Sequence, residues 1–415
     1  MDFLDITAIL LTLAALFAYI NHRWIKLPVT IGIMLISLIM SLVMIAVGQF
    51  IPTFDDSAKA FVESIDFNEL LMNGMLSYLL FAGALHVNLT DLKSQKRIVA
   101  IMATLGVTIT TFAVGTIAYY IFHMLGVEIP YAWCLVFGAL IAPTDPVAVL
   151  GILKTAGAPK SLETKITGES LFNDGVGVVI YLLLVGIATT GIGNVTVASV
   201  AEEFLLEAGG GILLGLVLGY ICYKMLKSID NYHVEVLLTL ALVTAGYRLA
   251  MQYHLSGPLA MVIAGLMIGN HARENAMSEQ TKANVDTFWE LIDEILNAIL
   301  FLLIGLEIFI LDFSTPVIVA GLLLIPISLI VRYISTAAAV ALLRKHKEFT
   351  PGVIKILTWG GIRGGISVAL ALAIPKEAGD ARAHILVATY IIVIFSISVQ
   401  GLTLKSLISR TLAKK

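Results

Sequence analysis

The chain has 415 residues, of which 59% are hydrophobic and 13% are charged, and its mean hydropathy is +0.95. Soluble domains carry roughly a quarter charged residues, so this composition excludes an ordinary soluble protein and is typical of a chain that crosses a membrane many times. The net charge of −3 gives no indication of a nucleic-acid partner. Cys134 and Cys222 lie in apolar segments and predict no disulfide framework.

Long apolar runs, separated by short polar loops, follow one another along the whole chain. About 20 helical residues cross the hydrocarbon core of a membrane, and an open strand edge cannot be satisfied in lipid. The sequence therefore predicts an all-α polytopic membrane protein of about thirteen helices, in a single domain over 1–415 with no additional soluble domain. The predicted spans are 6–21, 29–49, 69–89, 98–122, 132–153, 164–187, 203–226, 234–253, 256–270, 286–311, 315–342, 351–374 and 383–409.

Lysine and arginine are concentrated in every second loop between these spans. All but six of the 26 basic residues lie in alternate loops or in the tail, and only Lys59, Lys376 and Arg382 lie in the loops between them. The positive-inside rule then places the N-terminus outside and the C-terminus in the cytoplasm. Short loops and the absence of a visible targeting segment favour the plasma (inner) membrane of a prokaryote.

Three arginines and seven acids within the predicted spans are candidates for a functional role, because each costs at least about 2.5 kcal/mol at membrane depth on insertion scales. These residues are Arg248, Arg332, Arg363, Asp145, Glu169, Asp174, Glu290, Asp293, Glu294 and Glu307. Arg332 suits either a structural ion pair or a site role. For Arg248 and the last four acids, interfacial or packing roles near span ends are the simpler interpretation.

Asp145 stands in the motif Ala142-Pro143-Thr144-Asp145-Pro146, inside the fifth span. Two prolines remove two backbone donors and obstruct the helix at both positions, which leaves carbonyl oxygens one turn earlier without partners. Interrupted helices within a membrane are tolerated where they line a cavity, and they commonly form the ion sites of transporters. The alternative, a proline kink with an incidental acid, leaves the carboxylate without a cation.

The sixth span opens with Gly168-Glu169-Ser170-Leu171-Phe172-Asn173-Asp174-Gly175. Glu169 and Asn173 are four residues apart and share a face of the helix, as do Ser170 and Asp174. One helix can therefore present a carboxylate, a hydroxyl and an amide, oxygen ligands that suit a monovalent cation. The alternative is a small-residue packing face with polar contacts.

A second interruption is expected in the twelfth span, at Gly360-Gly361-Ile362-Arg363-Gly364-Gly365. Each glycine weakens a helix by roughly 1 kcal/mol relative to alanine. The two interruptions are seven spans apart and so run in opposite directions through the membrane. This offset predicts inverted repeats over about 1–187 and 234–410, joined by the helix 203–226. A buried Arg363 needs a partner, for which Glu169 is the obvious candidate.

In these three motifs the chain resembles the monovalent cation/proton antiporters of family 1, the sodium/proton exchangers. The similarity covers essentially the whole chain. It implies a homodimer in which each protomer has a dimerisation domain and a moving core domain, with the interrupted fifth and twelfth helices crossing in the core.

The resemblance also assigns roles to individual residues. It makes Asp174 the carboxylate that binds either a proton or the cation, and it places Na⁺ on Asp174, Asp145, Ser170 and Thr144.

Glu169 and Arg363 match the family's stabilising ion pair, with Asn173 held by the arginine. The chain departs from some relatives, which carry an acid at the end of the third span, where His86 or Asn88 stands here.

The function expected from these features is secondary active exchange of Na⁺ for H⁺, with Li⁺ or K⁺ as other substrates and a K⁺/H⁺ antiporter as the alternative. The resemblance of Asn173-Asp174 to the electroneutral branch, and the lack of a lysine in the tenth span, predict 1:1 exchange. A cation-coupled organic-anion symporter is a weaker alternative, because two aspartates repel anions. The sequence predicts neither an enzyme nor a resident cofactor; its expected partners are the two ions, lipid and a second copy of the chain.

Overall fold

The computed structural model describes residues 3–48, 50, 62, 65, 67, 69–145, 149–150, 152–153, 156–190, 197–311, 313–344 and 349–412. Regular structure in these residues is entirely helical, as the apolar runs predict. Pro146 of the first proline motif lies outside the described residues.

The first half of the chain forms α1 (Phe3–Ile20), α2 (Val29–Gly48), α4 (Leu76–Leu85), α5 (Leu89–Ile101), α6 (Val107–Met124), α7 (Tyr131–Ile141) and α9 (Lys160–Thr190). Wider π-helical turns over Asn21–Ile25, Glu69–Met75 and Met102–Gly106 extend or join these helices. The side chain of Asn88 accepts the backbone N–H groups of Thr90 and Asp91, and so caps the start of α5.

The second half forms α10 (Val197–Lys227), α11 (Tyr232–Gln252), α12 (Gly257–Met267), α13 (Arg273–Asn275), α14 (Glu279–Glu307), α15 (Thr315–Leu343), α16 (Val353–Trp359), α17 (Gly365–Leu372), α18 (Asp380–Phe395) and α19 (Gly401–Leu412). Further π-helical turns cover Ile268–Ala272 and Ser396–Gln400, and short 3₁₀ turns cover Ile308–Ile310 and Lys376–Ala378. Asn231, Ser256 and Ser278 cap the starts of α11, α12 and α14.

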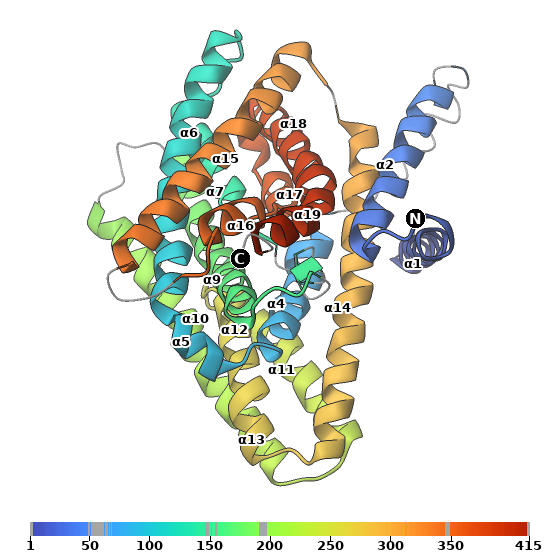
Figure 1. The fold of residues 1–415 in the computed structure, drawn as a ribbon, viewed down its shortest axis with the longest axis vertical. Helices are drawn as coiled ribbons and strands as arrows, with labels where there is room; N and C mark the ends of the chain where they lie inside the picture. The colour runs from blue at the N-terminus through green and yellow to red at the C-terminus, as the bar shows by residue number, and fades with distance from the viewer. Residues whose placement is uncertain are drawn as a thin grey trace.

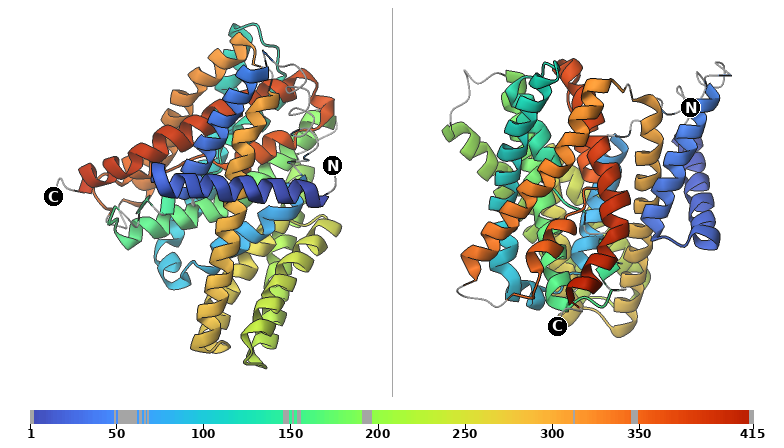
Figure 2. Two further views of the ribbon diagram at one scale, coloured as in Figure 1. Left: turned by 90° about the vertical axis from the view of Figure 1, so that its right-hand side faces the viewer. Right: turned by 45° about the horizontal axis from the view of Figure 1, so that its top comes forward.

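Eight helical stretches in the described residues are long and apolar enough to cross a membrane. The protein is therefore a multi-pass membrane protein. Every predicted span overlaps at least one of the helices above, although the count of thirteen and the division into inverted repeats stay predictions. Figures 1 and 2 show α7, α9, α16 and α17 in the middle of the molecule, with α6 and α15 on one side and α14, α2 and α1 on the other.

Both expected helix interruptions are present, and they contact each other. The helix α7 ends at Ile141 and the described residues 142–145 that follow are not helical, while α16 ends at Trp359 and α17 begins only at Gly365. The backbone N–H of Asp145 donates a 2.7 Å hydrogen bond to the carbonyl of Ile362. Two segments distant in the sequence therefore meet in the interior, where each satisfies part of the backbone that the other leaves open.

Candidate functional site

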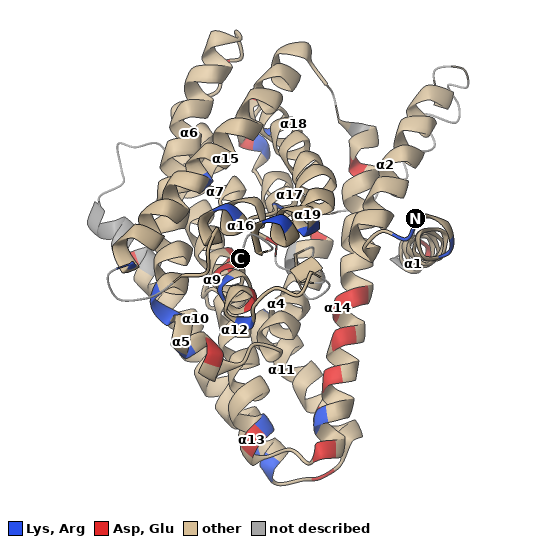
Figure 3. Ribbon diagram, in the orientation of Figure 1, with Lys and Arg blue, Asp and Glu red and all other residues tan. Residues whose placement is uncertain are grey.

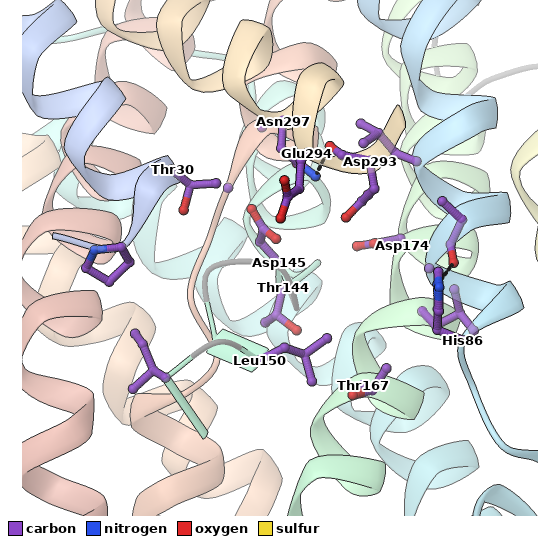
Figure 4. A pocket seen from close by; sticks show the side chains of 18 of the residues that line it. Thr30, His86, Thr144, Asp145, Leu150, Thr167, Asp174, Asp293, Glu294 and Asn297 are labelled. Atoms are coloured by element: carbon purple, nitrogen blue, oxygen red, sulfur yellow. Dashed lines mark hydrogen bonds between the residues drawn. The ribbon is translucent and has the colours of Figure 1, made fainter. Parts of the chain in front are cut away.

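A cavity of about 1180 Å³ reaches the point where the two interruptions meet. Its inner wall includes Pro143, Thr144 and Asp145, the start of α17, and Asp174 from α9 (Figure 4). Lys26, Lys160 and Lys405 also line the cavity, and all three belong to loops or helix ends that the predicted topology places in the cytoplasm. The cavity thus extends from these lysines to the interrupted helices.

Asp174 is the most deeply enclosed acid of this wall. Its side chain is 3% exposed, and its buried Oδ1 has no hydrogen-bond partner among the described residues. Gly177, one turn further along α9, allows the close approach, because a Cβ there would lie 2.5 Å from the ring of Pro143. Asp145 adds electrostatic repulsion to the burial of Asp174, so the pair favours a proton or a cation between them.

Thr144 joins the first interruption to α9 through side-chain hydrogen bonds. Its hydroxyl lies 2.9 Å from that of Ser170 and accepts a 3.0 Å hydrogen bond from the amide of Asn173. The Thr144 backbone N–H also donates to the amide oxygen of Asn173, at 3.4 Å. Asn173 is therefore held by Thr144, and the expectation that an arginine holds it was wrong.

Of the four predicted cation ligands, Thr144, Asp145 and Asp174 line the cavity, and Ser170 lies directly behind Thr144. The structure thus brings together the non-helical segment after α7 and the helix α9, which the motifs identified separately. No residue of this set comes from a surface loop.

Arg363 lies in the second interruption and donates to carbonyls that the broken helices leave open. Its Nε donates to the carbonyl of Ile141, the last residue of α7, at 3.2 Å, and its Nη1 donates to that of Gly361 at 2.9 Å. A cation is favourable at the C-terminal end of a helix, where carbonyl oxygens concentrate negative charge. Arg363 therefore stabilises the ends of both interrupted helices.

The partner of Glu169 is Arg332 on α15, through a buried ion pair from Nη1 to Oε1. The sequence prediction paired Glu169 with Arg363 instead, and that partner was wrong. The physical reason is that Arg363 directs its Nε and Nη1 to carbonyls at the two interruptions, whereas Arg332 projects from α15, which packs beside α16. A buried carboxylate and guanidinium each need a partner of opposite charge, which Glu169 and Arg332 supply to each other.

His86 and Asn88 have different surroundings, although both line the cavity. His86 Nδ1 lies 2.8 Å from the carbonyl of Ala82, and since a carbonyl only accepts, Nδ1 carries the proton there. The side chain of Asn88 caps α5. His86 remains on the α4 wall of the cavity (Figure 4), so a role near the ions stays a prediction.

An acidic face of α14 forms the opposite wall and was missed as a site feature by the sequence reasoning. Asp286, Glu290, Asp293 and Asn297 recur at helical spacing, and they line the cavity together with Glu294. Figure 3 shows the acids along this helix, and Figure 4 shows Asp293 and Glu294 near Asp145 and Asp174. The spacing of 4, 3 and 4 residues is visible in the sequence. Because these acids lie near the end of a predicted span, the sequence analysis favoured interfacial roles for them.

Comparisons with known proteins identify the family of this chain. A family model described as "Sodium/hydrogen exchanger, transmembrane" matches residues 11–410. The Na(+)/H(+) antiporter NhaP of Pseudomonas aeruginosa is 49% identical over 99% of this chain and 97% of its own length. The Na(+)/H(+) antiporter NhaH of Halobacillus dabanensis is 34% identical, over 94% of this chain and 93% of its own.

The fold is similar to the solved structure of the sodium proton antiporter MjNhaP1 from Methanocaldococcus jannaschii at pH 8, with a TM-score of 0.76. That match covers 99% of this chain and 100% of the other, at 21% identity. The extent of the family match and the identity to full-length relatives show that the chain belongs to the sodium/hydrogen exchanger family.

Proposed function

We propose that this protein is a secondary active antiporter that exchanges Na⁺ for H⁺, with Asp174 as the carboxylate that carries either ion. The observation that carries the proposal is the buried Oδ1 of Asp174, which has no hydrogen-bond partner in the described part of the chain and lies at the wall of a large cavity. The names of the full-length relatives, which are Na(+)/H(+) antiporters, support the same pair of substrates.

Competition for one carboxylate is sufficient to couple the two fluxes. An ionised Asp174 next to Asp145 is costly in a low-dielectric interior, so the empty carboxylate opposes movement of the site across the membrane. A proton or a cation removes this cost, and in either loaded form the site can move from access to one face of the membrane to access to the other. Asp145 and Thr144 add oxygen ligands for the cation, and Ser170 and Asn173 fix the position of Thr144.

Exchange is proposed to be electroneutral, with one Na⁺ for one H⁺. Asn173 is a neutral amide engaged with Thr144, so Asp174 is the single acid that this stretch of α9 adds to the cavity wall. We further propose a homodimer in the plasma (inner) membrane, with the cavity open to the cytoplasm. The lysines among its lining residues, Lys26, Lys160 and Lys405, support that orientation by the positive-inside rule.

The test uses purified protein in acid-loaded proteoliposomes, with proton efflux followed after addition of Na⁺, Li⁺ or K⁺. Efflux driven by Na⁺, unchanged when valinomycin clamps the potential and lost in Asp174→Asn, supports the proposal. A response to K⁺ alone would assign K⁺/H⁺ exchange. Full activity of Asp174→Asn would overturn the role of this carboxylate, and flux that depends on the potential would overturn the 1:1 stoichiometry.

A further inference from the structure

The π-helical turn Ser396–Gln400 lies between α18 and α19, in the part of the chain where α19 packs beside α16 (Figure 1). Such turns are rare, and they occur frequently at functional sites. The side chains at its two ends, Ser396 and Gln400, are polar but fully buried. Neither lines the cavity, yet both form hydrogen bonds with the second interruption, between α16 and α17.

Ser396 holds the peptide group to which Asp145 is bound. The backbone N–H of Arg363 donates to the Ser396 hydroxyl at 2.9 Å. The carbonyl of the same peptide group, that of Ile362, accepts the 2.7 Å hydrogen bond from the backbone N–H of Asp145. A peptide group is planar, so its N–H and its C=O turn together. Ser396 therefore fixes the direction in which the Ile362 carbonyl meets Asp145.

Gln400 in turn fixes the hydroxyl of Ser396. The hydroxyl donates to Oε1 of Gln400 at 2.6 Å, and Nε2 of Gln400 donates to the carbonyl of Trp359, the last residue of α16, at 2.9 Å. The two ends determine the direction of these bonds, because a backbone N–H only donates and a carbonyl only accepts. The hydroxyl and the amide must therefore each accept on one side and donate on the other.

Four hydrogen bonds thus run head to tail from Asp145 to Trp359. They pass through one peptide group, one hydroxyl and one side-chain amide, and hydrogen bonds in such a chain strengthen one another in a low-dielectric interior. The Asp145 side chain lies against the same stretch of backbone, because a Cβ at Gly364 would be 2.0 Å from its Oδ2. A change in the direction of this backbone would therefore reach the carboxylate.

We propose that Ser396 and Gln400 are positioning residues of the ion site, which hold Asp145 in place without touching the transported ion. Ser396 acts through the peptide group that binds Asp145, and Gln400 acts through Ser396. When the chain is broken, the Ile362 carbonyl can turn, and the Asp145 carboxylate spends less time where it binds Na⁺. This inference rests on the proposed exchange, with Asp145 as a ligand of the cation.

The first test measures Na⁺-dependent proton efflux from proteoliposomes that contain Ser396→Ala. Alanine lacks both the acceptor and the donor of this position, so the KM for Na⁺ should rise about fivefold, the scale of one neutral hydrogen bond. Vmax per folded protein should stay within about twofold of the wild-type value. Ser396→Thr, which keeps the hydroxyl, should recover most of the affinity. An unchanged KM would overturn the proposal, and a lower Vmax or Tm beside it would show that Ser396 supports only the fold.

Gln400→Met breaks the chain at a second point and leaves the bond between Arg363 and Ser396 in place. Methionine fills a similar space and has no amide. Its KM for Na⁺ should rise about threefold, and an unchanged KM would overturn the proposal even if Ser396→Ala does not fold. The double variant should have the KM of Ser396→Ala alone, because a chain already broken is not weakened again. Two effects that multiply would show that the residues act separately, and would refute the chain.

Two control variants remove neighbouring hydrogen bonds that lie outside the chain. Ser398→Ala, in the same π-helical turn, loses a bond from its hydroxyl to the carbonyl of Ile394 in its own helix. Thr403→Val loses the acceptor of the Trp359 indole N–H and leaves the Trp359 carbonyl bonded as before. Both variants should keep the wild-type KM. A rise in either one equal to that of Ser396→Ala would reveal a general effect of this segment and would refute the specific chain.

These outcomes separate the positioning of Asp145 from the exchange itself. If the wild-type protein exchanges no ions, the proposed function fails before the variants are compared. If the wild type exchanges Na⁺ for H⁺ and Asp174→Asn abolishes the exchange, while Ser396→Ala and Gln400→Met keep the wild-type KM, the positioning role is refuted and the exchange stands.

Discussion

The backbone N–H of Asp145 donates a 2.7 Å hydrogen bond to the carbonyl of Ile362, and this contact joins the two interrupted helices at the candidate ion site. Arg363 reinforces the junction, because its guanidinium donates to carbonyls on both sides of it. The site is therefore built on buried, non-helical backbone, and the guanidinium of Arg363 holds this backbone in place. Its geometry depends on residues that never touch the transported ion.

Gly364 is one such residue. A Cβ at this position would lie 2.0 Å from Oδ2 of Asp145, so Gly364→Ala forces the carboxylate away from the second interruption. We expect the KM for Na⁺ to rise about tenfold, with normal expression, because a displaced ligand loses a contact of roughly 1.4 kcal/mol. The measurement is Na⁺-dependent proton efflux from proteoliposomes.

The matched control for this substitution is Gly186→Ala on α9, where an added Cβ meets nothing within 4 Å. Alanine is a better helix former than glycine, so Gly186→Ala should retain the KM and leave the Tm unchanged or higher. A Gly364→Ala protein with the wild-type KM would show that Asp145 does not need its observed position.

The ion pair between Glu169 and Arg332 predicts strong coupling between two substitutions. Glu169→Gln or Arg332→Gln alone leaves a buried charge unpaired, which costs about 3–5 kcal/mol, whereas the double variant loses both charges together. The fall in Tm of the double variant should therefore be much smaller than the sum of the two single effects. Thermal unfolding in detergent measures all three.

The same cycle with Arg363→Gln in place of Arg332→Gln tests which arginine is the partner. Arg363 donates to backbone carbonyls, so its loss should add to that of Glu169 with much weaker coupling. Stronger coupling of Glu169 to Arg363 than to Arg332 would restore the pairing expected from sequence.

The sequence predicts the fold class and the motifs of this site better than it predicts the contacts within it. Apolar runs fix where helices form, and the Pro143 and Gly360–Gly365 patterns correctly locate two interruptions, because these residues act through their own backbone. The partners of charged side chains cannot be predicted in this way. Whether Glu169 meets Arg332 or Arg363 depends on how α9, α15 and α16 pack, and no local pattern carries that information.

The acidic face of α14 illustrates a second limit. The spacing of Asp286, Glu290 and Asp293 is visible in the sequence, but it is equally compatible with a helix end at the membrane surface. Only the packing of α14 beside the two interruptions turns this face towards a cavity.

The acidic face of α14 should attract cations into the cavity through its electrostatic field. Replacing Asp293 by Asn together with Glu290 by Gln should raise the KM for Na⁺ about threefold at low ionic strength and leave Vmax nearly unchanged. The effect should shrink when an inert salt brings the ionic strength to about 0.1 M, where charges are screened over about 10 Å. Glu279→Gln, an exposed position at the start of the same helix and outside the cavity wall, is the matched control. A KM that rises equally at all salt concentrations would instead indicate direct ligation.

Competition between protons and Na⁺ at Asp174 determines how the apparent KM for Na⁺ depends on pH, in both sign and slope. Protons and Na⁺ exclude each other from one carboxylate, so acidification on the Na⁺ side should raise the apparent KM for Na⁺. Once the protonated form predominates, the KM should rise about tenfold for each pH unit, which is a slope of one in a logarithmic plot. Saturating Na⁺ should restore the same Vmax at each pH, because it displaces the proton from that face. A slope of two would mean that a second group, with Asp145 the nearest acid of the set, loses a proton for each Na⁺ bound, and the one-for-one stoichiometry would then be wrong.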